Sequence, residues 1–186
     1  LGREARARLP SSSGLSPAGV ELALDEHLET EPRPDELAAL MASCGSAPCC
    51  QVLLAANVCT AALRALACAA ATAERVRVRP SRRDPVLAEL LVRASEDALD
   101  IQLTENLRPE PGVELHAYGD DATLTQIAQE RPAGVRMRAL GTGFGVAVVE
   151  RDGVLEAAGE AVAADLLHFD GRGCLSPRLV LVNGDA

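Results

Sequence analysis

The sequence has few aromatic residues and no lysine, and each shortage argues against a class of function. Aromatic residues make up 2% of the 186 residues and tryptophan is absent, so we do not expect the aromatic platforms on which unpaired nucleotide bases stack. The formal net charge of −9 also opposes binding to a phosphate backbone. Because all 18 basic residues are arginine, no lysine can form a Schiff base with a carbonyl substrate.

Signals for secretion, membrane insertion and zinc binding are also missing. The sequence shows no signal peptide and no apolar run long enough to cross a bilayer, so we expect a cytoplasmic protein whose six cysteines stay reduced. No two cysteines have the C-x-x-C spacing of a zinc site, and the three histidines are scattered along the chain. We therefore expect no metal ion.

Short apolar runs alternate with helical patterns through most of the chain. Strands are expected at residues 51–55, 75–79, 113–118, 134–140, 144–149 and 178–182, and helices at 35–43, 58–71, 84–97, 121–130 and 154–169. This alternation is typical of an α/β fold with a mostly parallel sheet and helices on both faces. Residues 1–34 are rich in proline, serine and glutamate, and we expect a weakly ordered arm with a short helix near residues 20–28.

Two local patterns indicate how particular segments begin and turn. Asp84 and Pro85 are expected to be the N-cap and the first residue of a helix. The glycine-rich residues 141–145 resemble half of a dinucleotide-binding motif, but strand-like residues 146–149 follow them where that motif needs a helix. We therefore expect a tight turn between two strands.

Cys174 is the candidate nucleophile. It follows two glycines and precedes the apolar run 179–182, so a turn at the start of a strand is expected to carry it. A thiol on such a turn can be aimed at a carbonyl carbon, and its own backbone N–H can stabilise the oxyanion. Arg172 would favour the thiolate, and His168 could act as a base, although a histidine that ends a helix is more often structural. The simpler alternative for Cys174 is a buried, unreactive thiol.

Further candidates follow strands, at the sheet edge where open α/β folds bind ligands. Asn57 comes after the strand at 51–55, where its amide could donate to an oxyanion or could cap the next helix. Five arginines lie within residues 75–83. Those that follow the strand could hold a nucleotide phosphate or ribose, and the alternative is a solvated loop.

These segments resemble, in their order, the acyl-CoA reductases of the LuxC type, the fatty acid reductases of bacterial luminescence systems within the aldehyde dehydrogenase superfamily. The similar segments are Ala56-Asn57-Val58, Val78-Arg79-Pro80-Ser81-Arg82-Arg83-Asp84-Pro85, Tyr118-Gly119-Asp120-Asp121-Ala122-Thr123 and Phe169-Asp170-Gly171-Arg172-Gly173-Cys174-Leu175-Ser176-Pro177. The last segment is the most specific of the four, and the resemblance covers roughly residues 10–183.

The resemblance implies that NADPH or NADH reduces a fatty acyl-CoA, or an acyl-enzyme thioester, to a fatty aldehyde. Cys174 matches the nucleophile that attacks the thioester, and Asn57 matches the amide of the oxyanion hole. Arg79, Ser81 and Arg82 fall in the cofactor-binding segment, where arginine would suit the 2′-phosphate of NADPH. The resemblance also allows a homo-oligomer or an acyl-transferring partner subunit.

The sequence departs from the family pattern at several points, and the glycine-rich residues 142–145 lack the charged residues typical there. Arg79 stands where the superfamily often has lysine, and Gly171 stands where the family tends to have glutamine. Ala139 stands where hydrolytic aldehyde dehydrogenases carry a glutamate base, which fits reduction better than oxidation. The alternatives are a degenerate, non-catalytic module that binds nucleotide or a partner and, third, an aldehyde-oxidising dehydrogenase.

The resemblance divides the chain into three parts. Residues 1–34 would form the arm, residues 35–170 a Rossmann-like NAD(P)-binding domain, and residues 171–186 the start of a catalytic domain. We expect the chain to be the N-terminal piece of a longer protein, and to be inactive without the rest.

Overall fold

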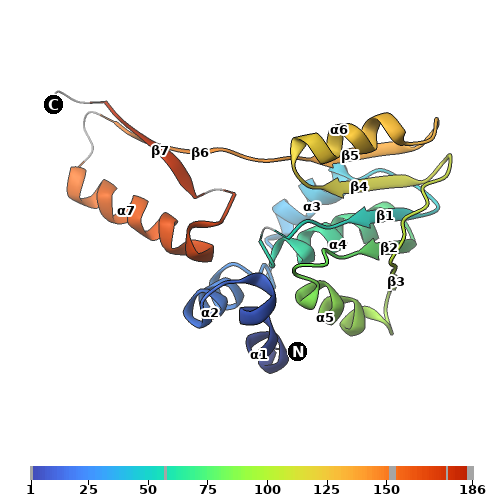
Figure 1. The fold of residues 1–186 in the computed structure, drawn as a ribbon, viewed down its shortest axis with the longest axis horizontal. Coiled ribbons are helices and arrows are strands. Elements are labelled where there is room, and N and C mark those ends of the chain that lie inside the picture. The colour runs from blue at the N-terminus through green and yellow to red at the C-terminus, as the bar shows by residue number, and fades with distance from the viewer. Residues whose placement is uncertain (1, 57, 151–153, 175, 184–186) are drawn as a thin grey trace.

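The largest sheet has five parallel strands in the order β3-β2-β1-β4-β5 (Figure 1). The computed structural model describes residues 2–56, 58–150, 154–174 and 176–183. The strands are β1 (Cys50–Leu53), β2 (Arg75–Arg79), β3 (Asp100–Leu103), β4 (Glu114–Tyr118) and β5 (Arg136–Leu140). Strand order reverses between β1 and β4, and in such sheets ligands bind beyond the carboxyl ends of the strands near that point. The predicted α/β class with a mostly parallel sheet is confirmed.

Helices cover both faces of this sheet. Helices α4 (Ala61–Thr72) and α5 (Val86–Ser95) lie on one face and α6 (Asp121–Glu130) on the other (Figure 1). Helix α3 (Pro34–Ser43) precedes β1 and contacts α4. Asp120 caps α6 by accepting the backbone N–H of Thr123 at 2.8 Å. These helices agree with the sequence prediction to within a few residues.

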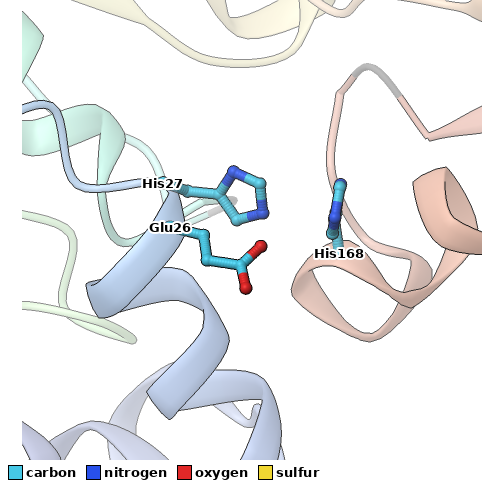
Figure 2. Close-up of side chains that lie close together, drawn as sticks. All are labelled: Glu26, His27 and His168. Atoms are coloured by element: carbon cyan, nitrogen blue, oxygen red, sulfur yellow. The ribbon is translucent and has the colours of Figure 1, made fainter.

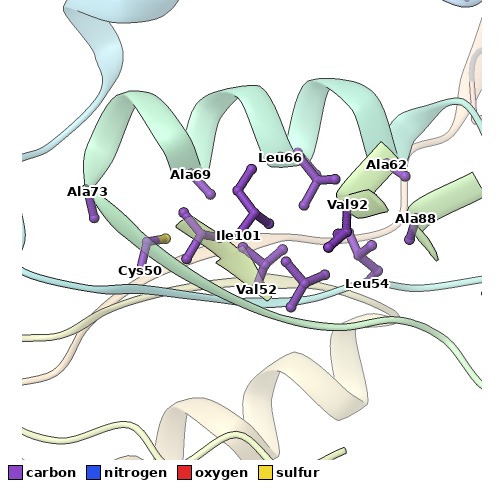
Figure 3. Close-up of a cluster of buried hydrophobic side chains, with 13 residues drawn as sticks. Cys50, Val52, Leu54, Ala62, Leu66, Ala69, Ala73, Ala88, Val92 and Ile101 are labelled. Atoms are coloured by element: carbon purple, nitrogen blue, oxygen red, sulfur yellow. The ribbon is translucent and has the colours of Figure 1, made fainter. Parts of the chain in front are cut away.

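The main core lies between β1–β3 and the helices α4 and α5 (Figure 3). In β2, Val76 and Val78 are buried while the alternating arginines are not, as expected for strand period 2. Alanines on the sheet-facing side of α4 let the helix lie close to the strands. The buried residues of this cluster are Cys50, Val52, Leu54, Ala62, Ala65, Leu66, Ala69, Ala73, Val76, Val78, Ala88, Val92 and Ile101.

The expectation that the N-terminal segment is weakly ordered is wrong. It forms two helices, α1 (Gly2–Ser13) and α2 (Pro17–Glu26), which pack on α5 and make a second core cluster. Leu9 is fully buried there, and Val20 is nearly so. The segment is rich in proline, serine and glutamate, but it also has apolar residues at helical spacing. Their packing on α5 outweighs the weak helix propensity of the segment.

A second, smaller sheet pairs β6 (Gly145–Val149) with β7 (Pro177–Val182) in parallel. Helix α7 (Leu155–Leu167) and the short 3₁₀ segment η1 (His168–Gly171) connect the two strands. Residues 141–144 therefore join two separate sheets, and the expected tight turn between neighbouring strands is wrong. Many apolar side chains of this small unit are exposed: Val146, Val148, Val154, Leu155, Leu166, Leu167, Leu179, Val180, Leu181 and Val182.

Two other local expectations need correction. Asp84 does not cap α5, because Pro85 occupies the N-cap position and Asp84 instead accepts a hydrogen bond from the Ser12 hydroxyl at 2.9 Å. Strand β3 was not foreseen, because only Ile101 of its four residues is buried and its apolar pattern is correspondingly weak. Among the described helices, none has the length and apolarity that a bilayer crossing requires.

Candidate active site

Cys174 lies on an exposed loop whose backbone has an unusual conformation. Three consecutive residues before it adopt positive φ, with values of 54° at Phe169, 51° at Asp170 and 71° at Gly171. Glycine accepts this conformation freely, but an L-residue in the left-handed region costs roughly 1–2 kcal/mol. Two such residues in succession need tertiary contacts to hold them. Strain of this kind tends to occur at functional sites.

The turn between α1 and α2 supplies those contacts. The Asp170 carboxylate accepts the Ser16 backbone N–H at 2.6 Å and the Ser16 hydroxyl at 3.1 Å. A methyl group added at Gly19 would lie 2.6 Å from Asp170 Oδ1, so glycine lets the carboxylate reach the positive end of the α2 dipole. Arg172 adds a long hydrogen bond to the Ser13 carbonyl at 3.4 Å. The N-terminal helices thus fix the loop that carries Cys174.

The glycine-rich connection after β5 runs beside Cys174. A methyl group added at Gly143 would lie 3.4 Å from the Cys174 carbonyl oxygen and 3.9 Å from its Cβ. The Thr142 backbone N–H donates to Asp121 Oδ1 at 3.2 Å, and Asp121 begins the helix that follows β4. Cys174 is therefore held near the carboxyl ends of β4 and β5, the edge at which a parallel sheet binds its ligands.

Asn57, the predicted oxyanion donor, lies outside the described residues. The strand before it, β1, ends at the same carboxyl edge, where the Leu54 backbone N–H donates to the Arg79 carbonyl at 3.0 Å. The pairing of Asn57 with Cys174 stays a prediction.

The predicted cofactor segment begins at this edge as well. Arg79 ends β2 and is half-buried, as is Ser81, whose hydroxyl accepts the Arg83 backbone N–H at 3.2 Å. Arg82 and Arg83 are exposed. Across residues 2–56, 58–150, 154–174 and 176–183, no ion pair involves Arg79, Arg82 or Arg83. Their charges are thus not neutralised by carboxylates in this part of the chain, and a phosphate could use them.

The histidines are less scattered in space than in sequence. His168, considered as a base for Cys174, instead packs its ring edge-on against His27, with 4.2 Å between ring centroids. Burial, together with the nearby His168, lowers the pKa of His27. His116 is fully buried in β4 beside Glu114 at 2.9 Å, and Glu114 also pairs with Arg136 at 3.2 Å. Because Glu114 and Arg136 begin their strands, this cluster lies at the sheet edge opposite Cys174.

Cys174 is exposed to solvent, whereas the cysteines of the core are buried. Burial raises the pKa of Cys50 to about 12 and that of Cys59 to about 11, and burial also raises the pKa of Cys68. Cys44 and Cys49 are half-buried, whereas Cys174 is exposed. Since the thiolate is the reactive form, the three core thiols are poor nucleophiles at neutral pH.

Cys174 is therefore expected to react first when native protein is treated with iodoacetamide near pH 8. The rate should exceed those of Cys50 and Cys59 by about tenfold or more, because their raised pKa values leave little thiolate. Peptide mass spectrometry at timed quenches measures each rate. A Cys174→Ser variant should lose the fast phase alone. Equal rates at the exposed and buried thiols would contradict the assignment.

Sequence reasoning missed the support that α1 and α2 give to the Cys174 loop. One local signal was present. Ser16-Pro17 is a helix start, with serine as N-cap and proline at the first helical position, and the Ser16 hydroxyl accepts the Gly19 N–H at 3.0 Å. The long-range partner, Asp170, has no local signal because it lies 154 positions from Ser16 in the sequence.

Comparison with solved structures identifies the fold. An NAD-dependent benzaldehyde dehydrogenase from Corynebacterium glutamicum matches with a TM-score of 0.74 at 16% identity, over 97% of this chain and 46% of that one. Lactaldehyde dehydrogenase from Escherichia coli matches with a TM-score of 0.72 at 18% identity, over 97% and 44%. PnpE in complex with nicotinamide adenine dinucleotide matches with a TM-score of 0.63 at 17% identity, over 74% and 32%. The chain thus spans less than half the length of these enzymes.

Sequence comparison identifies the family. No curated protein sequence matches the chain. The family model described as acyl-CoA reductase (LuxC) matches residues 23–186, which is most of the chain and includes both Cys174 and the segment after β2. The chain belongs to the LuxC acyl-CoA reductase family.

Proposed function

We propose that the complete protein reduces an acyl-CoA, or another acyl thioester, to an aldehyde with electrons from NADPH. The observation that carries this proposal is the exposed Cys174, held beside Gly143 at the carboxyl edge of the parallel sheet. Membership of the acyl-CoA reductase family supports the reaction type. The fold shared with aldehyde dehydrogenases supports a nicotinamide cofactor at this edge.

The geometry suits nucleophilic catalysis by a cysteine. The Cys174 thiolate attacks the thioester carbonyl carbon, and the C–S bond to the CoA sulfur breaks as the tetrahedral intermediate collapses, leaving an acyl group on Cys174. The backbone N–H of Cys174 and the Asn57 amide would donate to the oxyanion. NADPH supplies a hydride to the acyl carbon when bound. The resulting thiohemiacetal releases the aldehyde, and the sulfur leaves as thiolate.

The residues after β2 suit the cofactor's adenosine end. Arg79 and Ser81 lie half-buried at the carboxyl edge, and Arg82 beside them is exposed, without an ion-pair partner in the described segments. Arginine matches phosphate through two parallel N–H donors. A loop with several free guanidinium groups in a chain of net charge −9 therefore favours the 2′-phosphate of NADPH over the hydroxyl of NADH.

Alanine at position 139, in place of a glutamate base, favours reduction over aldehyde oxidation. Ala139 is an exposed residue of β5 whose methyl group cannot activate a water molecule. Hydrolysis of the acyl-enzyme would waste the thioester, so a reductase is more efficient with alanine than with a glutamate base at position 139. Oxidation of an aldehyde to an acid would need another residue to take the role of the missing carboxylate.

The complete gene product is expected to form aldehyde from a long-chain acyl-CoA and NADPH. In that protein, Arg82→Ala should raise the KM for NADPH, because it removes a guanidinium group that would bind the 2′-phosphate. A lost charge-assisted hydrogen bond of about 1.5–3 kcal/mol corresponds to roughly a 10- to 100-fold increase. The KM for NADH should change little. Arg33→Ala is the matched control, because Arg33 is an exposed arginine paired with Asp35 at the start of α3.

Steady-state rates and trapping of the aldehyde as its hydrazone measure both effects. No aldehyde from the wild-type protein with either cofactor would contradict the reductase and favour a non-catalytic module. Equal KM changes for NADPH and NADH would contradict a 2′-phosphate contact by Arg82.

A further inference from the structure

Glu26, His27 and His168 converge where the end of α2 meets the start of η1 (Figure 2). One ligand atom from each residue lies within 4.8 Å of the other two. Figure 2 shows a ring nitrogen of His27 turned toward His168, with the Glu26 carboxylate beside it. This cluster takes no part in the thioester chemistry proposed for Cys174.

One polar atom of this cluster makes no hydrogen bond to the residues that the structure describes. The Nε2 atom of His27 is buried and accepts or donates no hydrogen bond within the described part of the chain. Leaving such a group unsatisfied costs about 1–3 kcal/mol. The neighbouring ring of His168 lies edge-to-face at 66°, and the ring of Phe169 lies 5.1 Å from that of His27, so these two rings offer the atom at most a weak N–H···π contact. A bound cation would satisfy it.

We propose that Glu26, His27 and His168 bind a divalent transition metal, with Zn²⁺ as the best-fitting ion. Two imidazoles and one carboxylate are a common zinc ligand set, and a water molecule would complete the tetrahedron. Metal–ligand bonds of about 2.0–2.2 Å place tetrahedral ligands roughly 3.4 Å apart. Binding would require the side chains to close the present separation of up to 4.8 Å, and the His168 ring, which lies edge-to-face with His27, to turn a nitrogen toward the ion. Glu26 is exposed and can move toward it. The harder ions Mg²⁺ and Ca²⁺ would be bound poorly, since they prefer oxygen ligands.

The position of the site gives the metal a structural consequence. His168 directly precedes Phe169 and Asp170, the two strained residues that lead to Cys174. The Asp170–Ser16 contact already ties this loop to the start of α2. A metal at Glu26, His27 and His168 would tie the same loop to the end of α2, so occupancy would fix the segment before the nucleophile at both ends of one helix.

Competition with a chromophoric chelator measures the affinity of the full chain for added ZnCl₂. Removing a residue that only hydrogen-bonds to a metal ligand typically lowers metal affinity by about 10- to 100-fold. Removing a ligand itself should cost more, so we expect His168→Ala and His27→Ala each to weaken Zn²⁺ binding by more than about 100-fold. Excess Zn²⁺ should raise the melting temperature of the wild-type protein by about 5–10 °C and leave that of His168→Ala unchanged. Glu31→Gln, an exposed acid outside the cluster, is the matched control and should bind normally.

The six thiols could also bind zinc, so the ligands need a second readout. The Co²⁺-loaded protein should show the visible bands of a tetrahedral site without the near-ultraviolet charge-transfer band of thiolate ligation, and Cys174→Ser should bind Zn²⁺ as the wild type does. Circular dichroism shows whether each variant is folded. Undiminished affinity in folded His168→Ala, a thiolate band, or no stoichiometric Zn²⁺ binding would each overturn the site.

Discussion

Replacing Cys174 with alanine is expected to lower kcat/KM for the proposed acyl-CoA reduction by on the order of 10⁴-fold or more, because loss of the proposed covalent nucleophile would remove the main reaction path. The thiol is exposed and points from a loop fixed by Asp170 and Ser16, so the substitution should leave the fold intact. The rate of NADPH oxidation and the yield of aldehyde measure the loss in the complete gene product.

Cys49→Ala is the matched control for that experiment. Cys49 is half-buried and directly precedes β1, at the sheet edge opposite Cys174, so its removal should change kcat/KM little. Far-ultraviolet circular dichroism confirms that both variants are folded. Substantial activity in Cys174→Ala, or an equal loss in Cys49→Ala, would contradict the role of Cys174.

Leu9→Ala is expected to destabilise the protein by about 2–5 kcal/mol, the usual cost of a cavity left by a buried leucine. Leu9 of α1 is fully buried against α2 and α5, in one cluster with Val20 and Leu90. The size of the effect measures whether the N-terminal helices belong to the core or only lie on it. Chemical denaturation of wild type and variant gives the difference in the free energy of unfolding.

Leu37→Ala on α3 serves as its control, because Leu37 is 43% exposed and most surface substitutions change stability by less than about 0.5 kcal/mol. An effect of Leu9→Ala as small as that of Leu37→Ala would mean that α1 is not part of the cooperative core. It would also remove the proposed support of the Cys174 loop, since Ser13 and Ser16 reach that loop from the end of α1 and the start of α2.

The fold was predictable where local pattern and burial agree. The alternating valines and arginines of β2 and the alanine-rich α4 have patterns that match their burial in the sheet and core. Strand β3 was missed because its single buried residue, Ile101, gives no period. The glycine-rich residues 141–144 were expected to form a tight turn, since sequence cannot show that β5 and β6 belong to different sheets.

The candidate site was predictable only in part. The glycines near Cys174 indicate a sharp turn, but nothing local indicates that Phe169 and Asp170 take positive φ. That conformation depends on the Ser16 contacts, which are long-range and arise only after α2 docks. The pairing of His27 with His168 was missed for the same reason, because the two residues are 141 positions apart in the sequence and no spacing rule connects them.

Trapping the acyl-enzyme tests the role of Cys174 most directly. The complete gene product is incubated with an acyl-CoA in the absence of NADPH, quenched in acid and digested, and its cysteine peptides are analysed by mass spectrometry. We expect the acyl mass as a thioester on the Cys174 peptide, removable by hydroxylamine and absent from Cys174→Ala. An acyl group on another residue, or free CoA released without any acylated cysteine, would contradict nucleophilic catalysis by Cys174.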